Sequence, residues 1–243
     1  MDSILKANSM DKFLTLLFCL SGIVLTAQTD SIRSFIFGHS LINHEFTQLP
    51  PPGDELKMPH WLFKLAEEAG HYYAANGKYG FLPQHDDLPP FSQWGFLEVP
   101  SLWDSDTQDF TEADFNNILI TAGNFIQYQA PTEPYYNEPE TTPISATLDI
   151  IDWVSAQEDS LTIYIYENWP DMGSLIGAFP PDETQMETYN DYTLEGFHDW
   201  WLEYHDSLRF QRPDICIKMI PVGPIIADLY VNTVVQDIPV LEL

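Results

Sequence analysis

Basic residues are scarce in this chain. Nine lysines and arginines stand against 37 aspartates and glutamates, which gives a formal net charge of −28. A surface this acidic repels phosphate backbones, so the sequence excludes nucleic acid as a partner and disfavours anionic membranes. No calcium-binding D-x-[DN]-x-[DN]-G loop occurs among the acidic residues. We therefore interpret the charge as a solubilising surface.

Cysteine is almost absent as well, with two in the whole sequence, Cys19 and Cys216. Removal of an N-terminal segment that contains Cys19 would leave a single thiol, which excludes an internal disulfide. Cys216 lies in an apolar, strand-like run, and we expect it in the core. Neither H-E-x-x-H nor C-x-x-C is present. We expect neither a metal nor a cofactor.

Long apolar runs are also lacking, apart from residues 13–24 near the N-terminus. Lys12 precedes this run, and Ala27 stands at a suitable cleavage point before Gln28. The run is short for a membrane span and typical of a secretory signal peptide. We expect residues 1–27 to be that signal, and the mature protein to be secreted or periplasmic with no membrane partner. A retained anchor is the alternative.

Strand-like and helix-like segments alternate along the rest of the chain, which is 44% hydrophobic overall. This alternation predicts a single domain over residues 28–243, with a three-layer α/β/α architecture and a mainly parallel sheet of about five strands. The predicted strands are residues 34–37, 71–75, 117–121, 161–166 and 215–222. The predicted helices are residues 59–70, 142–156, 192–210 and 224–231, with a long loop over residues 83–100.

Ligands of such folds bind beyond the carboxyl ends of the strands. Ser40 follows the first predicted strand in the segment Phe37–Leu41, where an exposed hydroxyl suits a nucleophile and equally suits a helix cap. Residues 76–80 follow the second strand and contain two glycines. These residues either leave backbone N–H groups open to a ligand or form an ordinary turn. Asn124 follows the third strand, where its amide can donate to an oxyanion or form an Asx-turn.

Taken together, these three segments resemble the SGNH (GDSL-like) hydrolases, over roughly residues 32–231. The resemblance implies a flavodoxin-like SGNH hydrolase fold and a serine esterase, with Ser40 as the catalytic nucleophile. It also implies an oxyanion hole formed by the Gly80 N–H, or that of Gly77, and the Asn124 side chain. One departure is His39, which stands where the family usually has aspartate.

The family's remaining catalytic pair, a D-x-x-H motif after the fifth strand, is missing. The last histidine is His205, before that strand, and no D-x-x-H occurs anywhere. Without a base we expect the 243-residue chain to be nearly inactive. Two explanations stay open: a domain truncated at its C-terminus, which we favour, and a non-catalytic secreted binding module. His39 and His44 flank the serine as substitute bases, whereas His198 and His205 are expected on a helix surface.

The segment that follows the fourth strand, residues 167–172, should lie at the same carboxyl edge of the sheet as the other candidate residues. Together with aromatic residues elsewhere, it can stack on a sugar or pack the loops; these residues are Trp94, Trp103, Tyr135 and Tyr136. Relatives of the SGNH type often act on carbohydrate esters. The resemblance therefore implies a small-molecule or carbohydrate ester as substrate, with carbohydrate O-acyl esters as the first class to test.

Overall fold

The computed structural model describes residues 30–43, 57–92, 94–121, 129–177 and 179–231. The chain divides into two compact units, Met1–Asp30 and Ser31–Leu243. The expected signal peptide, residues 1–27, lies outside the described residues. In the described part of the chain, no helix combines the length and apolar character that a membrane crossing requires.

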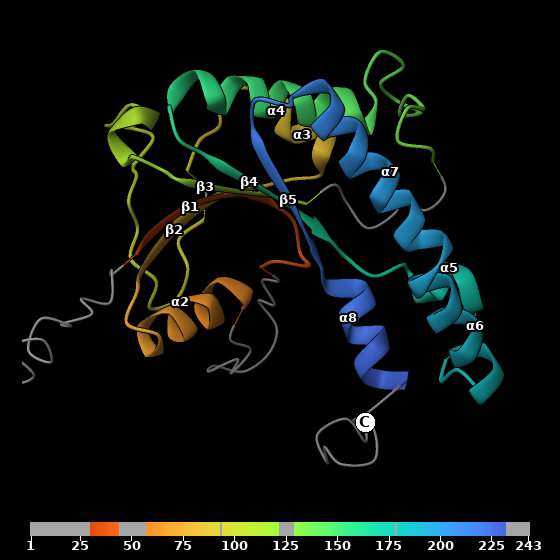
Figure 1. The fold of residues 1–243 in the computed structure, drawn as a ribbon. Coiled ribbons are helices and arrows are strands. Elements are labelled where there is room, and N and C mark those ends of the chain that lie inside the picture. Colours follow the sequence, from red (N-terminus) through yellow and green to blue (C-terminus); the bar gives the residue numbers. More distant parts are fainter. Residues whose placement is uncertain (1–29, 44–56, 93, 122–128, 178, 232–243) are drawn as a thin grey trace, which may run out of the picture. The chain divides into compact units, whose positions relative to one another are not determined.

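The second unit is built on a five-stranded sheet in which all neighbouring strands are parallel. The strand order is β2-β1-β3-β4-β5, so β1 and β3 lie at the centre (Figure 1). The strands are β1 (Ser31–Gly38), β2 (Tyr72–Tyr79), β3 (Asn117–Ile120), β4 (Thr162–Glu167) and β5 (Cys216–Pro221). The predicted parallel sheet of about five strands is confirmed.

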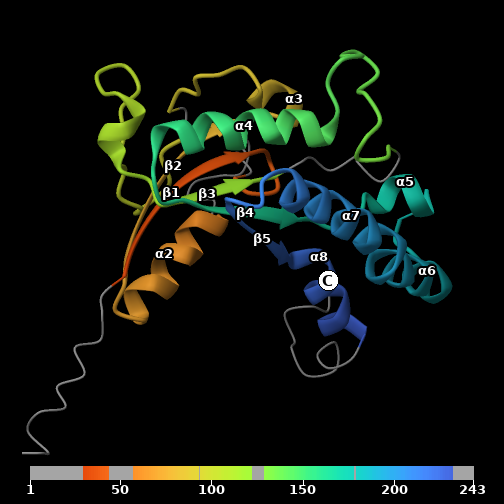
Figure 2. The ribbon, with the colours of Figure 1, turned by 45° about the horizontal axis from the view of Figure 1, so that its top comes forward.

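Helices cover both faces of this sheet, which confirms the three-layer α/β/α architecture (Figures 1 and 2). On one face lie α3 (Leu82–His85), α4 (Pro143–Gln157) and α7 (Gly196–Gln211); on the other lie α2 (Met58–Glu68) and α8 (Val222–Leu229). Two further helices, α5 (Met172–Ile176) and α6 (Glu183–Leu194), precede α7, and the short 3-10 helix η1 (Phe110–Ala113) precedes β3.

Two differences from the sequence prediction bear on the carboxyl edge of the sheet. The single helix predicted over residues 192–210 is two helices, because the backbone of Glu195 leaves the helical region (φ −112°, ψ −96°) before Gly196 starts α7. The second strand runs to Tyr79 rather than ending at residue 75, since it pairs with β1 over its whole length. Residues 76–79, expected beyond the strand, are therefore part of it.

The core has one hydrophobic layer on each side of the sheet. Side chains of alternate strand positions, such as Phe35, Ile120 and Ile165, pack beneath α4 and α7. The buried stripe of α7 recurs every three or four residues and consists of Phe197, Trp201, Tyr204 and Leu208. The intervening strand positions, such as Ile36 and Leu119, pack on the side of α2. Both faces are thus apolar, as a parallel sheet covered by helices requires.

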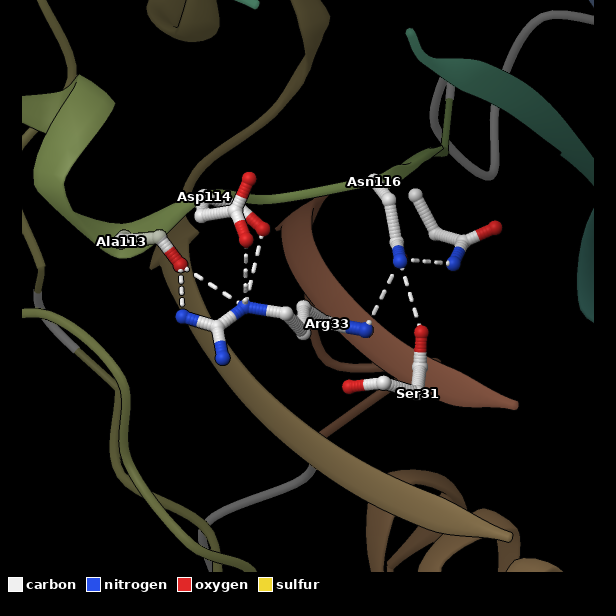
Figure 3. Close-up of polar contacts among 6 residues, drawn as sticks. Ser31, Arg33, Ala113, Asp114 and Asn116 are labelled. Carbon is white, nitrogen blue, oxygen red and sulfur yellow. Dashed lines mark hydrogen bonds and ion pairs between the residues drawn. The ribbon is translucent and has the colours of Figure 1, made fainter. Parts of the chain in front are cut away.

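Polar groups at the amino end of the sheet are paired with one another (Figure 3). The Arg33 guanidinium donates through Nε to the carbonyl oxygens of Ala113 (3.0 Å) and Asp114 (2.9 Å). The Asn116 side chain accepts from the Arg33 amide (2.9 Å) and donates to the Ser31 carbonyl (2.6 Å). These bonds tie the segment between η1 and β3 to β1 and so fix where β3 enters the sheet.

Cys216 does not lie in the core. It is the first residue of the edge strand β5, and its side chain is exposed. The apolar run around it led to the wrong expectation because β5 alternates: Ile217 is buried beneath α7, whereas Cys216 and Lys218 point to the opposite side and are exposed.

Candidate functional site

Ser40 lies in a turn directly after the inner strand β1. The His39 carbonyl accepts hydrogen bonds from the amides of Ile42 (2.9 Å) and Asn43 (3.2 Å), which closes the turn around the serine. Ser40 is partly exposed, and neither its amide nor its hydroxyl has a hydrogen-bond partner among the described residues. The sheet thus presents a partly exposed serine at its carboxyl edge, where ligands of parallel sheets bind.

Gly80 is the first residue after β2 and lies beside this turn. Its amide donates to the Gly38 carbonyl (2.9 Å), continuing the ladder between β1 and β2 by one bond. Gly77, the alternative candidate, lies inside β2 opposite Ile36, and a Cβ there would come within 2.7 Å of the Ile36 carbonyl oxygen. Gly77 therefore serves strand packing, and Gly80 is the glycine at the strand end.

Two buried histidines lie next to the serine turn. His39 stacks on Phe81 (ring centroids 5.4 Å apart), and His85 of α3 packs edge-on against Phe37 (5.4 Å). Burial lowers the pKa of His39 to about 4. Burial, assisted by the charge of Lys78, lowers the pKa of His85 to about 3. Both imidazoles are therefore neutral at pH 7.

Neither buried histidine is fully hydrogen-bonded within the described chain. The Nδ1 atom of His39 accepts from the Leu41 amide (3.3 Å), but its Nε2 has no partner. The ring nitrogens of His85 have no partner at good hydrogen-bond geometry in the described chain, although the main chains of Gly80 and Gly38 lie near enough to oppose the lowering of its pKa. An imidazole with so low a pKa is a weak proton acceptor at neutral pH, which disfavours either residue as a general base.

Asn124, the expected oxyanion donor, lies outside the described residues, and so does His44. The last described residue before that segment is Thr121, whose amide donates to the Phe37 carbonyl (3.0 Å). The chain therefore leaves β3 immediately beside the end of β1, one strand away from the turn that carries Ser40.

A carboxylate–histidine pair lies at the same edge of the sheet, at the end of β4. Glu167 is the last residue of β4 and its side chain is fully buried; Oε1 lies 2.8 Å from Nδ1 of His198 in the first turn of α7. The second oxygen, Oε2, is buried without a partner among the described residues. Burial raises the pKa of Glu167 to about 7, against the opposing effect of His198.

The His198 side chain is 26% exposed, so the imidazole that Glu167 holds through Nδ1 is in part accessible to solvent. The loop after β4 is itself held closely. Gly223 of α8 packs against it, and a Cβ at Gly223 would come within 2.5 Å of the Asn168 carbonyl oxygen. An imidazole oriented by a buried carboxylate can accept and return a proton, which is the chemistry of a general base.

The sequence did not reveal this pair, because its members are 31 residues apart and belong to different elements. Glu195 and His198 form an E-x-x-H motif in the sequence, but Glu195 is not the acid that contacts His198. Glu195 is exposed, at the junction of α6 and α7. Two signals were available. Glu167 ends a buried strand, and His198 lies next to Phe197 and three residues before Trp201, at the border of the buried stripe of α7.

The aromatic residues proposed for sugar stacking are dispersed. Trp94 and Trp103 are buried in opposite core layers, and Tyr136 is 98% exposed. A hollow of about 560 Å³ lies elsewhere, near α3, η1 and the end of α4; its lining includes Phe91, Trp103, Asp106, Asp109 and Trp153. Within the described residues, no three His, Cys, Asp or Glu side chains gather closely enough to hold a metal ion.

No protein-family model matches the chain, and neither the curated proteins nor the solved structures contain a match.

Proposed function

We propose that the protein is a secreted or periplasmic serine hydrolase that cleaves ester bonds, with Ser40 as the nucleophile. The observation that carries this proposal is the position of Ser40. It is a partly exposed serine in the turn that leaves β1, an inner strand of a parallel sheet ordered β2-β1-β3-β4-β5, and it has no hydrogen-bond partner among the described residues. This is where a nucleophile can meet a ligand bound beyond the strand ends.

The oxyanion donors proposed for this site are Gly80 and Asn124. The Gly80 amide already donates to Gly38, so it would contribute only by sharing that hydrogen bond or releasing it when substrate binds. The Ser40 amide, at the start of the turn and without a partner in the described chain, is an additional donor. Two or three N–H groups aimed at one oxygen are the usual composition of an oxyanion hole.

The charge of the chain restricts the substrate. A net charge of −28 repels anions, which favours neutral esters over phosphate or carboxylate-rich substrates. Neutral carbohydrate O-acyl esters meet this condition and remain the first class to test.

The proposal is tested by covalent capture of Ser40. A fluorophosphonate phosphonylates an activated serine: the Oγ–P bond forms, the P–F bond breaks, and fluoride leaves. We expect mass spectrometry of the labelled full-length chain to place the adduct on Ser40, and Ser40→Ala to abolish both labelling and any hydrolysis of p-nitrophenyl acetate. Ser160→Ala, at an exposed loop position, is the matched control. Labelling elsewhere, or unchanged labelling of Ser40→Ala, would contradict the proposal.

A second function, that of a carbohydrate-binding module, is favoured by the hollow near α3 and η1. Its lining combines aromatic rings, which can stack on sugar faces, with carboxylates and amides that can bond to hydroxyls. Phe91, which is 49% exposed, is its most accessible ring. If this function holds, Phe91→Ala should abolish oligosaccharide binding measured by calorimetry, whereas Ser40→Ala and Phe210→Ala, an exposed ring that does not line the hollow, should leave it intact.

A further inference from the structure

We propose that the hollow near α3 and η1 binds amino sugars, whose protonated amines are held by the carboxylates of its lining. This inference rests on the carbohydrate-binding function proposed for the hollow and deepens it, because it selects one class of sugar. The hollow has a volume of about 560 Å³, within the range of about 300–1,000 Å³ that is usual for small-molecule sites. Its lining comes from the loop after α3, the loop before η1, η1 itself and the last turns of α4.

Aromatic rings form one part of this lining. The Phe110 ring packs edge-on against Trp103 (ring centroids 5.2 Å apart) and Trp153 (4.9 Å). Trp103 and Phe110 are buried, whereas Trp153 is partly exposed and Phe91 is 49% exposed. An accessible ring covers an apolar sugar face, and it attracts a cation that lies within about 6 Å of its centroid.

The ring of Phe91 already faces one ammonium group of the protein. Nζ of Lys78 lies 5.4 Å from the Phe91 centroid. Lys78 is buried, and its Nζ donates to the carbonyl oxygens of Gln84 (3.1 Å) and Asp87 (2.8 Å), so it is tied to the main chain and does not line the hollow. The contact shows this ring as the partner of a cation, with half of its surface still accessible.

The charged residues of the lining are Asp106 and Asp109, and none of the lining residues is basic. The Asp106 carboxylate has no hydrogen-bond or ion-pair partner among the described residues, although its amide is fixed by donation to Oδ1 of Asp104 (3.0 Å). Asp109 is the N-cap residue of η1, and its amide donates to Oε2 of Glu112 (2.8 Å). The hollow therefore presents an unpaired carboxylate on a loop whose main chain is already held.

A protonated amine suits these groups better than a hydroxyl does. An ammonium group offers three N–H donors, and hydrogen bonds between ionised groups are roughly twice as strong as neutral ones. Hydroxyls of the same sugar can bond to the side-chain amides of Gln108 and Gln157. The net charge of −28 attracts cations further. Another hollow, of about 330 Å³ beside the start of β5, has Arg209 and Arg212 in its lining and lacks this complementarity.

The test is calorimetry on the full-length chain with the trisaccharide of glucosamine and its N-acetylated counterpart, at about pH 6, where free amines are protonated. We expect the amino trisaccharide to bind on the order of 10-fold more tightly than the acetylated one. Asp106→Asn should remove this advantage and leave the affinity for the acetylated sugar unchanged. Glu203→Gln, an exposed acid of α7 outside the lining, changes the net charge equally and should keep the advantage. Thermal unfolding of each variant shows whether it is folded.

The outcomes separate this inference from the function on which it rests. Equal affinities for the two sugars, both lost in Phe91→Ala, would overturn the selection of amines and leave the carbohydrate-binding function in place. An equal loss of amino-sugar binding in Asp106→Asn and Glu203→Gln would show attraction to the overall charge alone and would also overturn the inference. Absence of binding by either sugar would overturn the function of the hollow and this inference with it.

Discussion

Polar side chains differ in their hydrogen bonding between the two ends of the sheet. At the amino end, the Arg33 guanidinium and the Asn116 amide each bond to two or more backbone groups (Figure 3). At the carboxyl end, fully buried side chains keep nitrogen and oxygen atoms without partners in the described chain, including Oε2 of Glu167, Nε2 of His39 and both ring nitrogens of His85. The Arg33 and Asn116 groups form a closed network, although Oε1 of Glu158 and Oγ of Ser155, near the same end, are also buried without a partner in the described chain. At the carboxyl end the unpartnered atoms belong to side chains beside Ser40 and at the end of β4.

The difference has a thermodynamic meaning. A buried polar atom without a hydrogen bond costs about 1–3 kcal/mol, so several together represent a substantial loss of stability. Native proteins retain such atoms where a ligand, water or reacting group supplies the missing bond. We therefore expect the paired groups around Arg33 to matter for stability, and the unpartnered groups near Ser40 to be the ones whose replacement changes reactivity. Each prediction below perturbs one end and measures whether stability or reactivity responds.

The largest expected effect is a loss of stability in mild acid caused by His39 and His85. Their folded pKa values, about 4 and about 3, lie below the unfolded value of 6.5. Between these limits the unfolded chain binds more protons, so stability falls as pH falls below 6.5. At pH 5 each histidine should cost about 2 kcal/mol relative to pH 7.5, because 1.5 pH units correspond to that energy.

Urea unfolding of the wild type and of a His39→Leu/His85→Leu double variant measures this effect. The variant should lose about 4 kcal/mol less than the wild type between pH 7.5 and pH 5. His71→Leu, a partly exposed histidine before β2, should retain the wild-type pH dependence. An unchanged slope in the double variant would mean that these imidazoles are not buried in the neutral form.

Glu167→Gln should change stability in the opposite sense. The folded pKa of Glu167, about 7, lies above the usual 4.5, so the folded state binds more protons between these values and stability falls as pH rises through that window. At pH 8 the variant should be more stable than the wild type, by up to about 3 kcal/mol, and the gain should vanish near pH 4.5. Glu203→Gln, at an exposed position of α7, should have no comparable effect.

A Glu167→Gln variant that is less stable than the wild type at pH 8 would indicate that the pair serves structure, as the amino end does.

Asn116→Leu tests the amino end. The substitution removes the acceptor for the Arg33 amide and the donor to the Ser31 carbonyl, and it should destabilise the protein by about 2 kcal/mol. We expect the labelling rate of Ser40 in the folded variant to stay at the wild-type value. A selective loss of labelling would show that the two ends are coupled and would break the comparison.

The sequence predicted the architecture because each strand and helix has its own pattern of apolar residues within a short segment. Strands such as Thr162–Glu167 and the sheet as a whole follow from apolar runs bounded by helical segments. The end of β2 at Tyr79 could not be predicted, since Asn76 and Gly77 are poor strand formers. They are held there by tertiary bonds, in which the Asn76 side chain donates to the Trp103 carbonyl (3.1 Å) and accepts from the Leu102 amide (2.8 Å).

The candidate site likewise has residues that local sequence predicts and a contact that it does not. Ser40 and Gly80 could be proposed from the sequence because they stand just past the ends of strands, so their place in the fold depends on local sequence. The pairing of Glu167 with His198 depends on how α7 rotates over the end of β4, and on the break at Glu195 that sets where α7 begins. A contact over 31 residues between an acid and a histidine has no local pattern, so a search for D-x-x-H could not detect it.

The smallest expected effect separates stability from reactivity within the carboxyl half itself. Thr142 caps α4, which leads from the end of β3 back to the start of β4 and so begins towards the carboxyl side. Its Oγ1 accepts from the Ser145 amide (2.9 Å), and Ser145 Oγ accepts in turn from the Thr142 amide (2.8 Å).

Thr142→Ala should cost about 1 kcal/mol, the usual value of such a cap, and leave Ser40 labelling unchanged. Thr184→Ala, exposed in α6, should stay within about 0.5 kcal/mol of the wild type. If instead Thr142→Ala slowed labelling strongly, reactivity would be reporting general loosening of this half of the domain, and the contrast between the two ends would lose its functional meaning.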